Sequence, residues 1–206
     1  MLATANTLVL ATRNAHKVRE VQRLLGPAGI AVEPLPGSVA LPPEDGDTFA
    51  ANALPKARAA AEATHRPAIA DDSGIEAEAL DGAPGVRSAR YAGPRASDEE
   101  NLRKLMEQAP AGSSLRYVCA LAYVDPASGI EHVFFGECRG RLANGRRGTG
   151  GFGYDPAFVP DDVADGRTMA ELSDEEKDAI SHRGRALRAL LEWLSMGGDG
   201  RPQHAT

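Results

Sequence analysis

The sequence is poor in features that would place a protein in a membrane or in an oxidising compartment. Cysteine occurs only twice among 206 residues, at positions 119 and 138, which argues against a scaffold held by disulfides. We expect both to be reduced core residues, although one disulfide between them would fit the same count. No apolar stretch approaches the roughly 20 residues that span a bilayer. Residues 1–6 lack a basic segment followed by a long apolar one, so we expect no secretory signal and a cytoplasmic location.

The sequence also has fewer basic than acidic residues: 23 lysines and arginines compared with 29 aspartates and glutamates. The net charge of −6 disfavours a broad nucleic-acid-binding surface, so any phosphate site has to be a local cluster of cations. The length suits one domain or a two-lobed one. We expect a single two-lobed domain over residues 7–196, between an N-terminal tail (1–6) and a Gly-rich, disordered C-terminal tail (197–206).

The most informative stretch is a short apolar run, residues 67–70, followed by Asp71, Asp72, Ser73 and Gly74. The run predicts a strand buried in a parallel sheet, and ligands of open α/β sheets bind beyond the carboxyl ends of such strands. Adjacent carboxylates there repel each other and lose hydration unless a cation is close. Mg²⁺ meets that need, because it takes oxygen ligands from one or two carboxylates and from substrate phosphates. The structural alternative is that an aspartate caps a turn and Gly74 supplies a positive φ.

A second informative segment is a predicted strand-to-helix turn near the N-terminus. Residues 7–12 are typical of a buried strand, and an amphipathic helix opens at Asn14 and stops at the Gly-Pro pair 26–27. Such a turn presents backbone N–H groups and the positive end of a helix dipole, which together favour an anion. Lys17, one turn into the helix, would add a charge for a phosphate. Alternatively, Asn14 is only the N-cap and Lys17 is a solvated lysine.

The next segments predict a strand over 30–35, an acidic turn that contains Glu44, and an alanine-rich helix over 48–65. Pro55 lies inside that helix and predicts a kink or a break near Leu54. Acidic turns are usually solvated, and spacing alone does not assign Glu44 to a metal.

The second half of the chain predicts a helix that opens with a capping box at Ser97, a hairpin of strands over 115–124 and 130–138, and a short strand at 158–159. Between them, segment 148–156 places four glycines around two aromatic residues. Glycines let a backbone approach a ligand closely, and an aromatic ring can stack on it. A mobile glycine loop with a core aromatic is the alternative.

The last helical segment opens with another capping box, at Ser173, and leads to Lys177, Ser181, His182 and Arg183. Lys177 and Ser181 lie one turn apart if the helix is continuous. Cations in the first part of a helix oppose its dipole, so they need a compensating partner such as an anionic ligand. A solvated basic face is the alternative.

Four segments together resemble the inosine triphosphate pyrophosphatase family, the noncanonical purine NTP pyrophosphatases. In the family's order they read T-x-N-x-x-K (12–17), A-D-D-S-G (70–74), G-G-F-G-Y-D-P (150–156) and K-x-x-x-S-H-R-G (177–184). The resemblance implies an α/β fold that is elongated and two-lobed, with a mixed twisted central sheet flanked by helices and an active-site cleft between the lobes. It also implies a homodimer and Mg²⁺-dependent hydrolysis of ITP, dITP and XTP to the monophosphate and pyrophosphate.

The resemblance assigns roles to individual residues. Asp72 would be the catalytic base and, with Glu44, a metal ligand. The expected substrate-binding residues are Thr12, Arg13, Asn14, Ala15, His16 and Lys17 for the triphosphate, Ser73 beside it, and Phe152, Gly153, Tyr154, Asp155, Lys177, His182 and Arg183 for the sugar and base. One position departs from the family pattern: Ala51 stands where bacterial members usually carry glutamate in T-F-x-E-N-A. Any metal-binding role at that position is therefore in doubt, and Glu44 and Asp72 carry more of it.

The donors in this set indicate how a base would be chosen. Hypoxanthine and xanthine carry an acceptor oxygen at C6, where adenine carries an amino donor. Lys177 and Arg183 are pure donors, so adenine would leave a buried donor unpaired at a cost of roughly 1–3 kcal/mol. Guanine shares the C6 oxygen, so its rejection has to come from its 2-amino group. Two other functions stay open: a pyrophosphatase of modified pyrimidine triphosphates and a non-catalytic nucleotide-sensing module.

Overall fold

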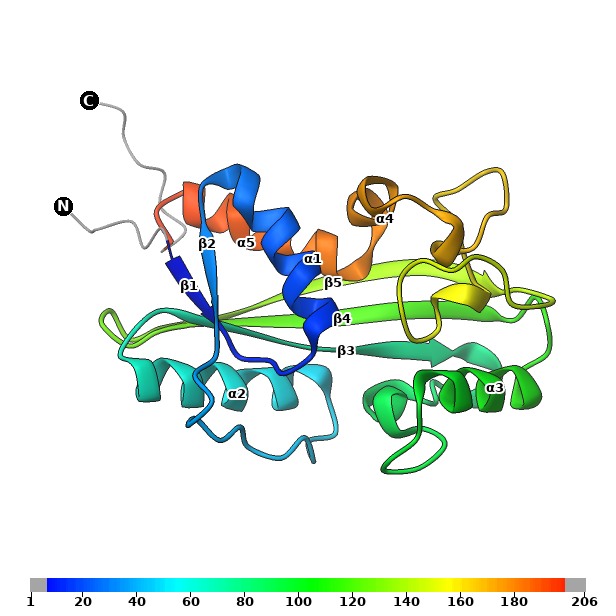
Figure 1. Cartoon of the computed structure of the whole chain (residues 1–206), viewed down its shortest axis with the longest axis horizontal. Helices are drawn as coiled ribbons and strands as arrows, with labels where there is room; N and C mark the ends of the chain where they lie inside the picture. Colours follow the sequence, from blue (N-terminus) through cyan, green and yellow to red (C-terminus); the bar gives the residue numbers. More distant parts are fainter. Residues whose placement is uncertain (1–6, 199–206) are drawn as a thin grey trace. The chain divides into compact units, whose positions relative to one another are not determined.

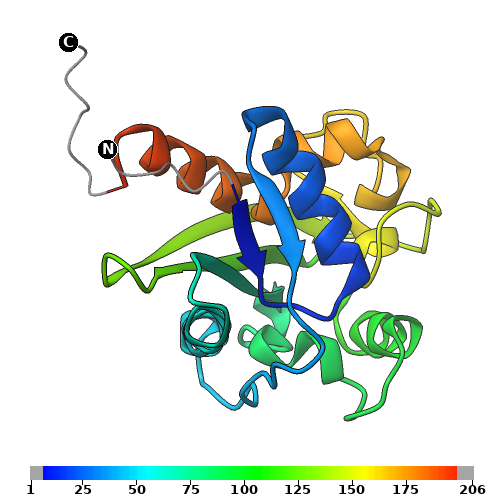
Figure 2. The ribbon, with the colours of Figure 1, turned by 60° about the vertical axis from the view of Figure 1, so that its left-hand side comes forward.

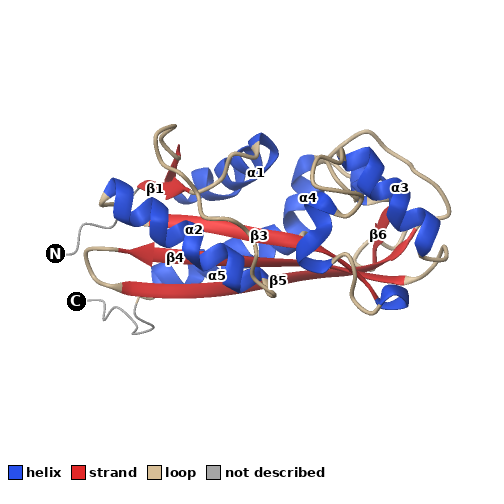
Figure 3. Ribbon diagram, turned by 90° about the horizontal axis from the view of Figure 1, so that it is seen from below, coloured by secondary structure: helices blue, strands red, loops and turns tan. Residues whose placement is uncertain are grey.

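The computed structural model describes residues 7–198, and it has the α/β architecture that the sequence predicts. Its strands, red in Figure 3, form one sheet in the order β2-β1-β3-β4-β5-β6. The strands are β1 (Thr7–Leu10), β2 (Ala31–Pro34), β3 (Ala68–Ala77), β4 (Ser114–Asp125), β5 (Ile130–Leu142) and β6 (Phe158–Pro160). The helices are α1 (Ala15–Leu25), α2 (Phe49–Thr64), α3 (Asp98–Gln108), α4 (Asp174–Ile180) and α5 (His182–Ser195), labelled in Figure 1. β1 is parallel to β2 and β3, whereas β5 is antiparallel to β6, so the sheet is mixed.

The chain divides into two compact units. Among the described residues, unit 1 comprises 7–72, 120–135 and 184–198, and unit 2 comprises 73–119 and 136–183. Strands β3, β4 and β5 each contribute residues to both units. The single two-lobed domain over 7–196 stays a prediction. The predicted N-terminal tail over 1–6 lies outside the described residues, as does the predicted C-terminal tail over 197–206 except for residues 197 and 198.

Local sequence signals explain where three of the described helices begin. The Asn14 side chain caps α1, and in unit 1 this helix lies alongside β2 (Figure 2). Capping boxes at Ser97 and Ser173 open α3 and α4 as predicted. Each unit has its own buried apolar residues, represented by Leu10 in unit 1 and Phe158 in unit 2, both fully buried.

The backbone bears on three expectations. The strand predicted to end at the aspartates continues as the ten-residue β3, which is an inner strand of the sheet. Of the kink or break predicted near Leu54, the break is wrong, because α2 runs through Pro55. Ala51, whose carbonyl loses its helical partner to this proline, is exposed to solvent. The last helix is not continuous, because Ser181 adopts an extended conformation (ψ 152°) between α4 and α5.

The two cysteines, Cys119 and Cys138, are buried thiols and do not form a disulfide, as expected. Over residues 7–198, none of the helices combines the length and the apolar character needed to cross a membrane.

Candidate active site

The end of β1 explains why polar groups gather in the middle of β3. The two strands pair only as far as Leu10 and Ile69, and the Ala11 N–H then donates to the Ile69 carbonyl at 2.8 Å. Beyond this point β1 gives way to the turn into α1, while β3 continues through Asp71 and Asp72. The carboxyl end of a parallel strand therefore does border the carboxylates, but that strand is β1 rather than β3.

Lys17 connects the first turn of α1 to this point of β3. Its Nζ lies 3.1 Å from Oδ2 of Asp71, a fully buried carboxylate, and 3.5 Å from the Asp71 carbonyl oxygen. Helix α2 supplies a second lysine, because Lys56 Nζ donates to the same carbonyl at 2.9 Å and forms an ion pair with Glu44. Two cations thus meet the carboxylates of β3 and of the acidic turn.

Asn52 holds Asp72 and the acidic turn together. Its Nδ2 donates to Asp72 Oδ2 at 2.8 Å, and its Oδ1 accepts from the Gly46 N–H at 2.8 Å. A Cβ on Gly46 would come within 2.8 Å of that Oδ1, so the turn fits Asn52 only with glycine there. We call these residues of unit 1 the carboxylate cluster: Lys17, Glu44, Asn52, Lys56, Asp71 and Asp72.

Sequence reasoning did not single out Asn52 and Lys56, which the structure places in the carboxylate cluster. Both are almost fully buried on α2, four positions apart on one face, where the other buried residues are Phe49 and alanines. A polar residue and a lysine at helical spacing among alanines were the available signal. Ala51, at the position of the family's glutamate, is exposed, and its N–H donates to the capping hydroxyl of Thr48.

Burial has the largest influence on the pKa of Asp72, a residue that is only 6% exposed. It raises the pKa of the carboxyl above its usual value, while Lys56, the Asn52 hydrogen bond and Lys17 lower it. Glu44 also raises this pKa, so the two carboxylates sense each other electrostatically.

A hard divalent cation fits this donor set. Mg²⁺ typically takes one or two carboxylates and completes its coordination with water and substrate phosphates, and Glu44 and Asp72 supply two such groups. Within residues 7–198 no group of three or more histidine, cysteine, aspartate or glutamate side chains could hold a metal ion alone. A metal held by Glu44 and Asp72 would complete its coordination with water and substrate oxygens.

The predicted anion site in the first turn is partly occupied by its own residues. Asn14 Oδ1 accepts from the N–H groups of His16 (2.9 Å) and Lys17 (3.3 Å), and the Asn14 N–H donates to Thr12 Oγ1 at 3.1 Å. Asn14 is thus the N-cap that the structural alternative describes, whereas Lys17 is not a merely solvated lysine. Ala15 is the first residue of α1.

Arg13 is engaged by the segment after β2. Its guanidinium donates to the carbonyl oxygens of Leu35 (2.8 Å), Pro36 (2.9 Å) and Val39 (2.9 Å). The next predicted residue, His16, lies on the exposed side of α1, with its Nδ1 2.9 Å from the Arg19 guanidinium. In this structure both side chains therefore contact protein groups outside the carboxylate cluster.

Unit 2 has a second polar centre, at Asp155 in the glycine-rich segment. This carboxylate is 3% exposed and accepts from Lys177 Nζ (2.7 Å) and the Phe152 N–H (2.9 Å) at Oδ2, and from the Tyr117 hydroxyl (3.0 Å) at Oδ1. Gly151 lies against it with φ +67°, and a Cβ there would come within 2.1 Å of Oδ2. The glycine therefore lets the backbone come close to another group, as expected, but the group that it approaches is the Asp155 carboxylate.

The Phe152 ring is half-buried and faces two cations. Lys177 Nζ lies 5.0 Å from its centroid and the Arg183 guanidinium carbon lies 5.9 Å away. Arg183 is almost fully buried and donates to Ser73 Oγ at 2.8 Å. The cations of the last predicted motif thus converge on one aromatic ring of unit 2.

Tyr117 of β4 joins this centre, although sequence reasoning did not single it out. Its ring stacks on His182 with centroids 4.6 Å apart and planes 5° apart, and it tilts against Phe158 at 4.7 Å. Burial, followed by the nearby Asp155 carboxylate, raises the Tyr117 pKa well above its usual value, so the hydroxyl keeps its proton. We call these residues of unit 2 the aromatic cluster: Tyr117, Phe152, Asp155, Lys177, His182 and Arg183.

Two residues of the glycine-rich segment point to other partners. Tyr154 is buried and its hydroxyl donates to the Ser88 carbonyl at 2.8 Å, while the Gly153 N–H donates to Asp98 Oδ2 at 2.9 Å. Tyr154 is therefore a core aromatic, which agrees with the structural alternative for this one residue.

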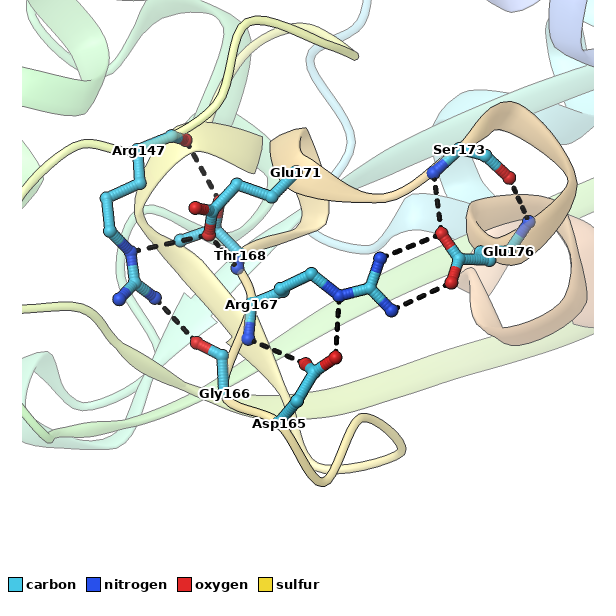
Figure 4. Close-up of polar contacts among 8 residues, drawn as sticks. All are labelled: Arg147, Asp165, Gly166, Arg167, Thr168, Glu171, Ser173 and Glu176. Atoms are coloured by element: carbon cyan, nitrogen blue, oxygen red, sulfur yellow. Dashed lines mark hydrogen bonds and ion pairs between the residues drawn. The ribbon is translucent and has the colours of Figure 1, made fainter.

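A surface network fixes the start of α4 and with it Lys177 (Figure 4). The Arg167 guanidinium binds both carboxylate oxygens of Glu176, at 2.7 and 2.9 Å, and also Asp165 at 2.8 Å. Glu176 closes the capping box with Ser173. The Arg167 hydrogen bonds are the main reason that the pKa of Glu176 falls to about 2.

The predicted site residues thus form two groups. Lys17, Glu44 and Asp72 meet in the carboxylate cluster, and Phe152, Asp155, Lys177, His182 and Arg183 meet in the aromatic cluster. Asp72, which ends the first segment of unit 1, and Ser73, which begins unit 2, are consecutive in β3.

Comparison with known proteins gives consistent results. A model of the Ham1 family matches residues 8–193. The chain is 53% identical to a dITP/XTP pyrophosphatase of Symbiobacterium thermophilum over 191 residues, which are 91% of this chain and 94% of that protein. The structure of a HAM1 protein from Coxiella burnetii aligns with a TM-score of 0.81 and 41% identity, over 92% of this chain and 98% of that one. A nucleoside-triphosphatase / dITP/XTP pyrophosphatase from Mycobacterium abscessus aligns with a TM-score of 0.68 and 41% identity, over 91% and 99%.

Proposed function

This chain belongs to the Ham1 family, and from that premise we propose that it is a dITP/XTP pyrophosphatase that hydrolyses dITP, ITP and XTP to the monophosphate and pyrophosphate. The observation that carries the proposal is the carboxylate cluster, where Lys17 and Lys56 meet Asp71 and Glu44 around a nearly buried Asp72. Paired lysines and carboxylates at the end of a parallel strand suit a polyphosphate with a divalent cation.

The triphosphate is bound by the cations of unit 1. Lys17 and Lys56 each carry a point charge for phosphate oxygens, and both already lie in hydrogen-bond or ion-pair contact with the backbone and carboxylates around Asp71. The turn from Thr12 to Asn14 adds the positive end of the α1 dipole. Arg13 contributes by fixing the 35–39 segment beside this turn, since its guanidinium holds three carbonyls there.

Glu44 and Asp72 are the residues that would hold Mg²⁺. When bound, the ion would neutralise phosphate charge and orient the reacting groups. Asn52 keeps the Asp72 carboxylate in one orientation by donating to its Oδ2, and it also ties down the turn that carries Glu44. The protein therefore prepares the geometry before the substrate arrives.

Asp72 accepts the proton in the chemical step. A water oxygen attacks the α-phosphorus and passes a proton to the Asp72 carboxylate, while the bond to the oxygen bridging the α- and β-phosphorus atoms breaks. The electron pair of that bond stays on pyrophosphate, whose charge the two lysines stabilise. Burial of Asp72 supports this role because it favours proton uptake by the carboxylate.

The aromatic cluster selects the base. The Phe152 ring offers a stacking surface, and Lys177 and Arg183 offer donors to the oxygen at C6 of hypoxanthine or xanthine. Adenine presents an amino donor at that position, which leaves a buried donor unpaired. Asp155 holds Lys177 in place, and Ser73 does the same for Arg183.

The test is a panel of ITP, dITP, XTP, ATP and GTP with Mg²⁺ and identification of the first product. We expect pyrophosphate from the first three at rates far above those from ATP and GTP. Equal rates on all five, or orthophosphate as the first product, would contradict the proposal. A modified pyrimidine triphosphate in the same panel tests the related pyrophosphatase function, and ITP binding without product release would indicate a sensing module.

We also infer a homodimer and a two-lobed molecule with the active site in a cleft, as the family resemblance implies. Light scattering of the purified chain tests the first inference: a mass of one chain at micromolar concentration would contradict it. A crystal structure with bound dITP tests the second.

A further inference from the structure

Tyr117 contacts both the carboxylate and the imidazole of the aromatic cluster. The hydroxyl donates to Asp155 Oδ1 at 3.0 Å, and the ring lies flat on His182 with centroids 4.6 Å apart. The residue is 6% exposed and comes from β4, an inner strand of the sheet. Its backbone position is therefore set by the sheet. The groups that it contacts lie at the end of the glycine-rich segment, where the short 3-10 turn η4 (Asp155–Ala157) begins, and at the start of α5.

The hydroxyl completes the hydrogen bonding of Asp155. Lys177 and the Phe152 N–H both donate to Oδ2, while Tyr117 donates to Oδ1. Donors on both oxygens prevent the carboxylate from rotating about its terminal torsion, and a fixed carboxylate fixes the ammonium of Lys177. The ring acts separately, because stacking sets the plane of the His182 imidazole.

We propose that Tyr117 is a positioning residue for base recognition, which holds Lys177 through Asp155 and holds His182 through ring stacking. This role rests on the proposed function and adds to it a determinant of base selectivity on β4. The two contacts are chemically separable: phenylalanine keeps the stacking ring and loses only the hydroxyl, whereas leucine loses both.

The experiment compares kcat and KM for dITP and dATP in the wild type, Y117F and Y117L. Loss of the hydroxyl loosens base binding rather than the reacting groups, so we expect Y117F to raise KM for dITP about tenfold with kcat within about threefold. The ratio of kcat/KM for dITP to that for dATP should fall by about the same factor, and further in Y117L. This ratio does not depend on the fraction of folded enzyme, since the same active molecules turn over both substrates.

Tyr123 provides the matched control. It lies on the same strand, is also 6% exposed and packs its ring on Trp193 at 5.3 Å, but it belongs to unit 1. Y123F removes a tyrosine hydroxyl outside the aromatic cluster, so it should leave the dITP-to-dATP ratio unchanged.

Each outcome decides the question. An unchanged ratio in Y117F, or an equal fall in Y123F, would overturn the positioning role while leaving the pyrophosphatase proposal intact. A fall in Y117F through kcat alone would also overturn it, because the reacting groups would then be affected. Absence of dITP turnover in the wild type would instead overturn the proposed function, and this role with it.

Discussion

At the scale of single residues, Asp72 combines deep burial with contacts that hold its carboxylate in place. The Asn52 amide donates to it, and Lys17 and Lys56 lie close enough to lower its pKa against the effect of burial. Such a residue gains little stability from its charge, because burial costs hydration that the neighbouring cations only partly return. Its charge is better explained by function than by folding.

We therefore expect D72N to abolish turnover and to preserve the fold. Asparagine keeps the shape and an oxygen acceptor for Asn52, but it can neither take a proton nor supply a carboxylate for Mg²⁺. The rate of pyrophosphate release should fall by about 10²–10⁴, and the midpoint of thermal unfolding should stay the same or rise. Circular dichroism provides the midpoint, and activity above a tenth of the wild-type rate would remove Asp72 from the chemical step.

Lys56 gives a second prediction at this scale. Replacing it with methionine keeps most of the apolar stem but leaves Glu44 and the Asp71 carbonyl without this cation. We expect K56M to lower kcat/KM for dITP by about 10², as found when a preorganised donor is removed from an active site.

The matched control for K56M is Arg58, two positions further along α2. Arg58 forms an exposed ion pair with Glu131, and exposed pairs contribute little to stability. R58M should leave kcat/KM within about twofold, because its ion pair lies outside the carboxylate cluster. Equal losses in the two variants would mean that Lys56 acts through the stability of α2.

At the scale of elements, the start of α4 depends on an ionised Glu176. Its pKa is about 2 in the folded chain and 4.5 in the reference state, so the folded state favours the charged form. The resulting stability is fully present above pH 4.5 and is lost as the pH falls toward 2. Because the Glu176 side chain is 45% exposed, salt should weaken this contribution.

The pH prediction compares urea unfolding of the wild type and E176Q. Stability of the wild type should fall more steeply than that of E176Q between about pH 4.5 and pH 2, since only the wild type takes up this proton. R167Q should behave like E176Q, and the double variant should show little further loss if the two residues act as one pair. If the free energy of unfolding changes with pH in the same way for the wild type and E176Q, the two hydrogen bonds from the Arg167 guanidinium to Glu176 do not have this role.

Elements set by local chemistry could be predicted from the sequence, and those set by distant partners could not. The caps at Asn14, Ser97 and Ser173 are within three residues of the groups they bind, so the starts of three helices were predicted correctly. The continuity of β3 through its aspartates depends on Lys17 and on residues of α2, which no local pattern reveals. The extended Ser181 between α4 and α5 is a similar case.

The same distinction applies to the candidate site. Motif resemblance found Asp72, Asp155 and Lys177, but it did not find Lys56 or Tyr117. Those two residues join the candidate site through contacts over 12 and 38 positions of sequence, with Glu44 and Asp155. The sequence around each residue is that of an ordinary helix or strand, so only the position of the distant partner reveals the contact.

At the scale of the whole molecule, metal binding and stability should be linked. If Glu44 and Asp72 hold Mg²⁺, the ion binds the folded chain better than the unfolded one and raises the midpoint of unfolding. Chelation with EDTA should abolish pyrophosphate release and added Mg²⁺ should restore it. The Mg²⁺-dependent rise in midpoint should be present in the wild type and absent in D72N; an equal rise in both would place the metal elsewhere.

The single tryptophan provides an intrinsic fluorescence probe of unit 1. Trp193 is the only indole in the chain and packs against Tyr123, His132 and Phe134, all in unit 1. Its emission during denaturation therefore follows unit 1, while the far-ultraviolet dichroism averages over every helix and strand. Superimposable curves would mean that the chain melts as one cooperative body, and displaced curves would reveal a half-melted species in which the two units lose order at different denaturant concentrations.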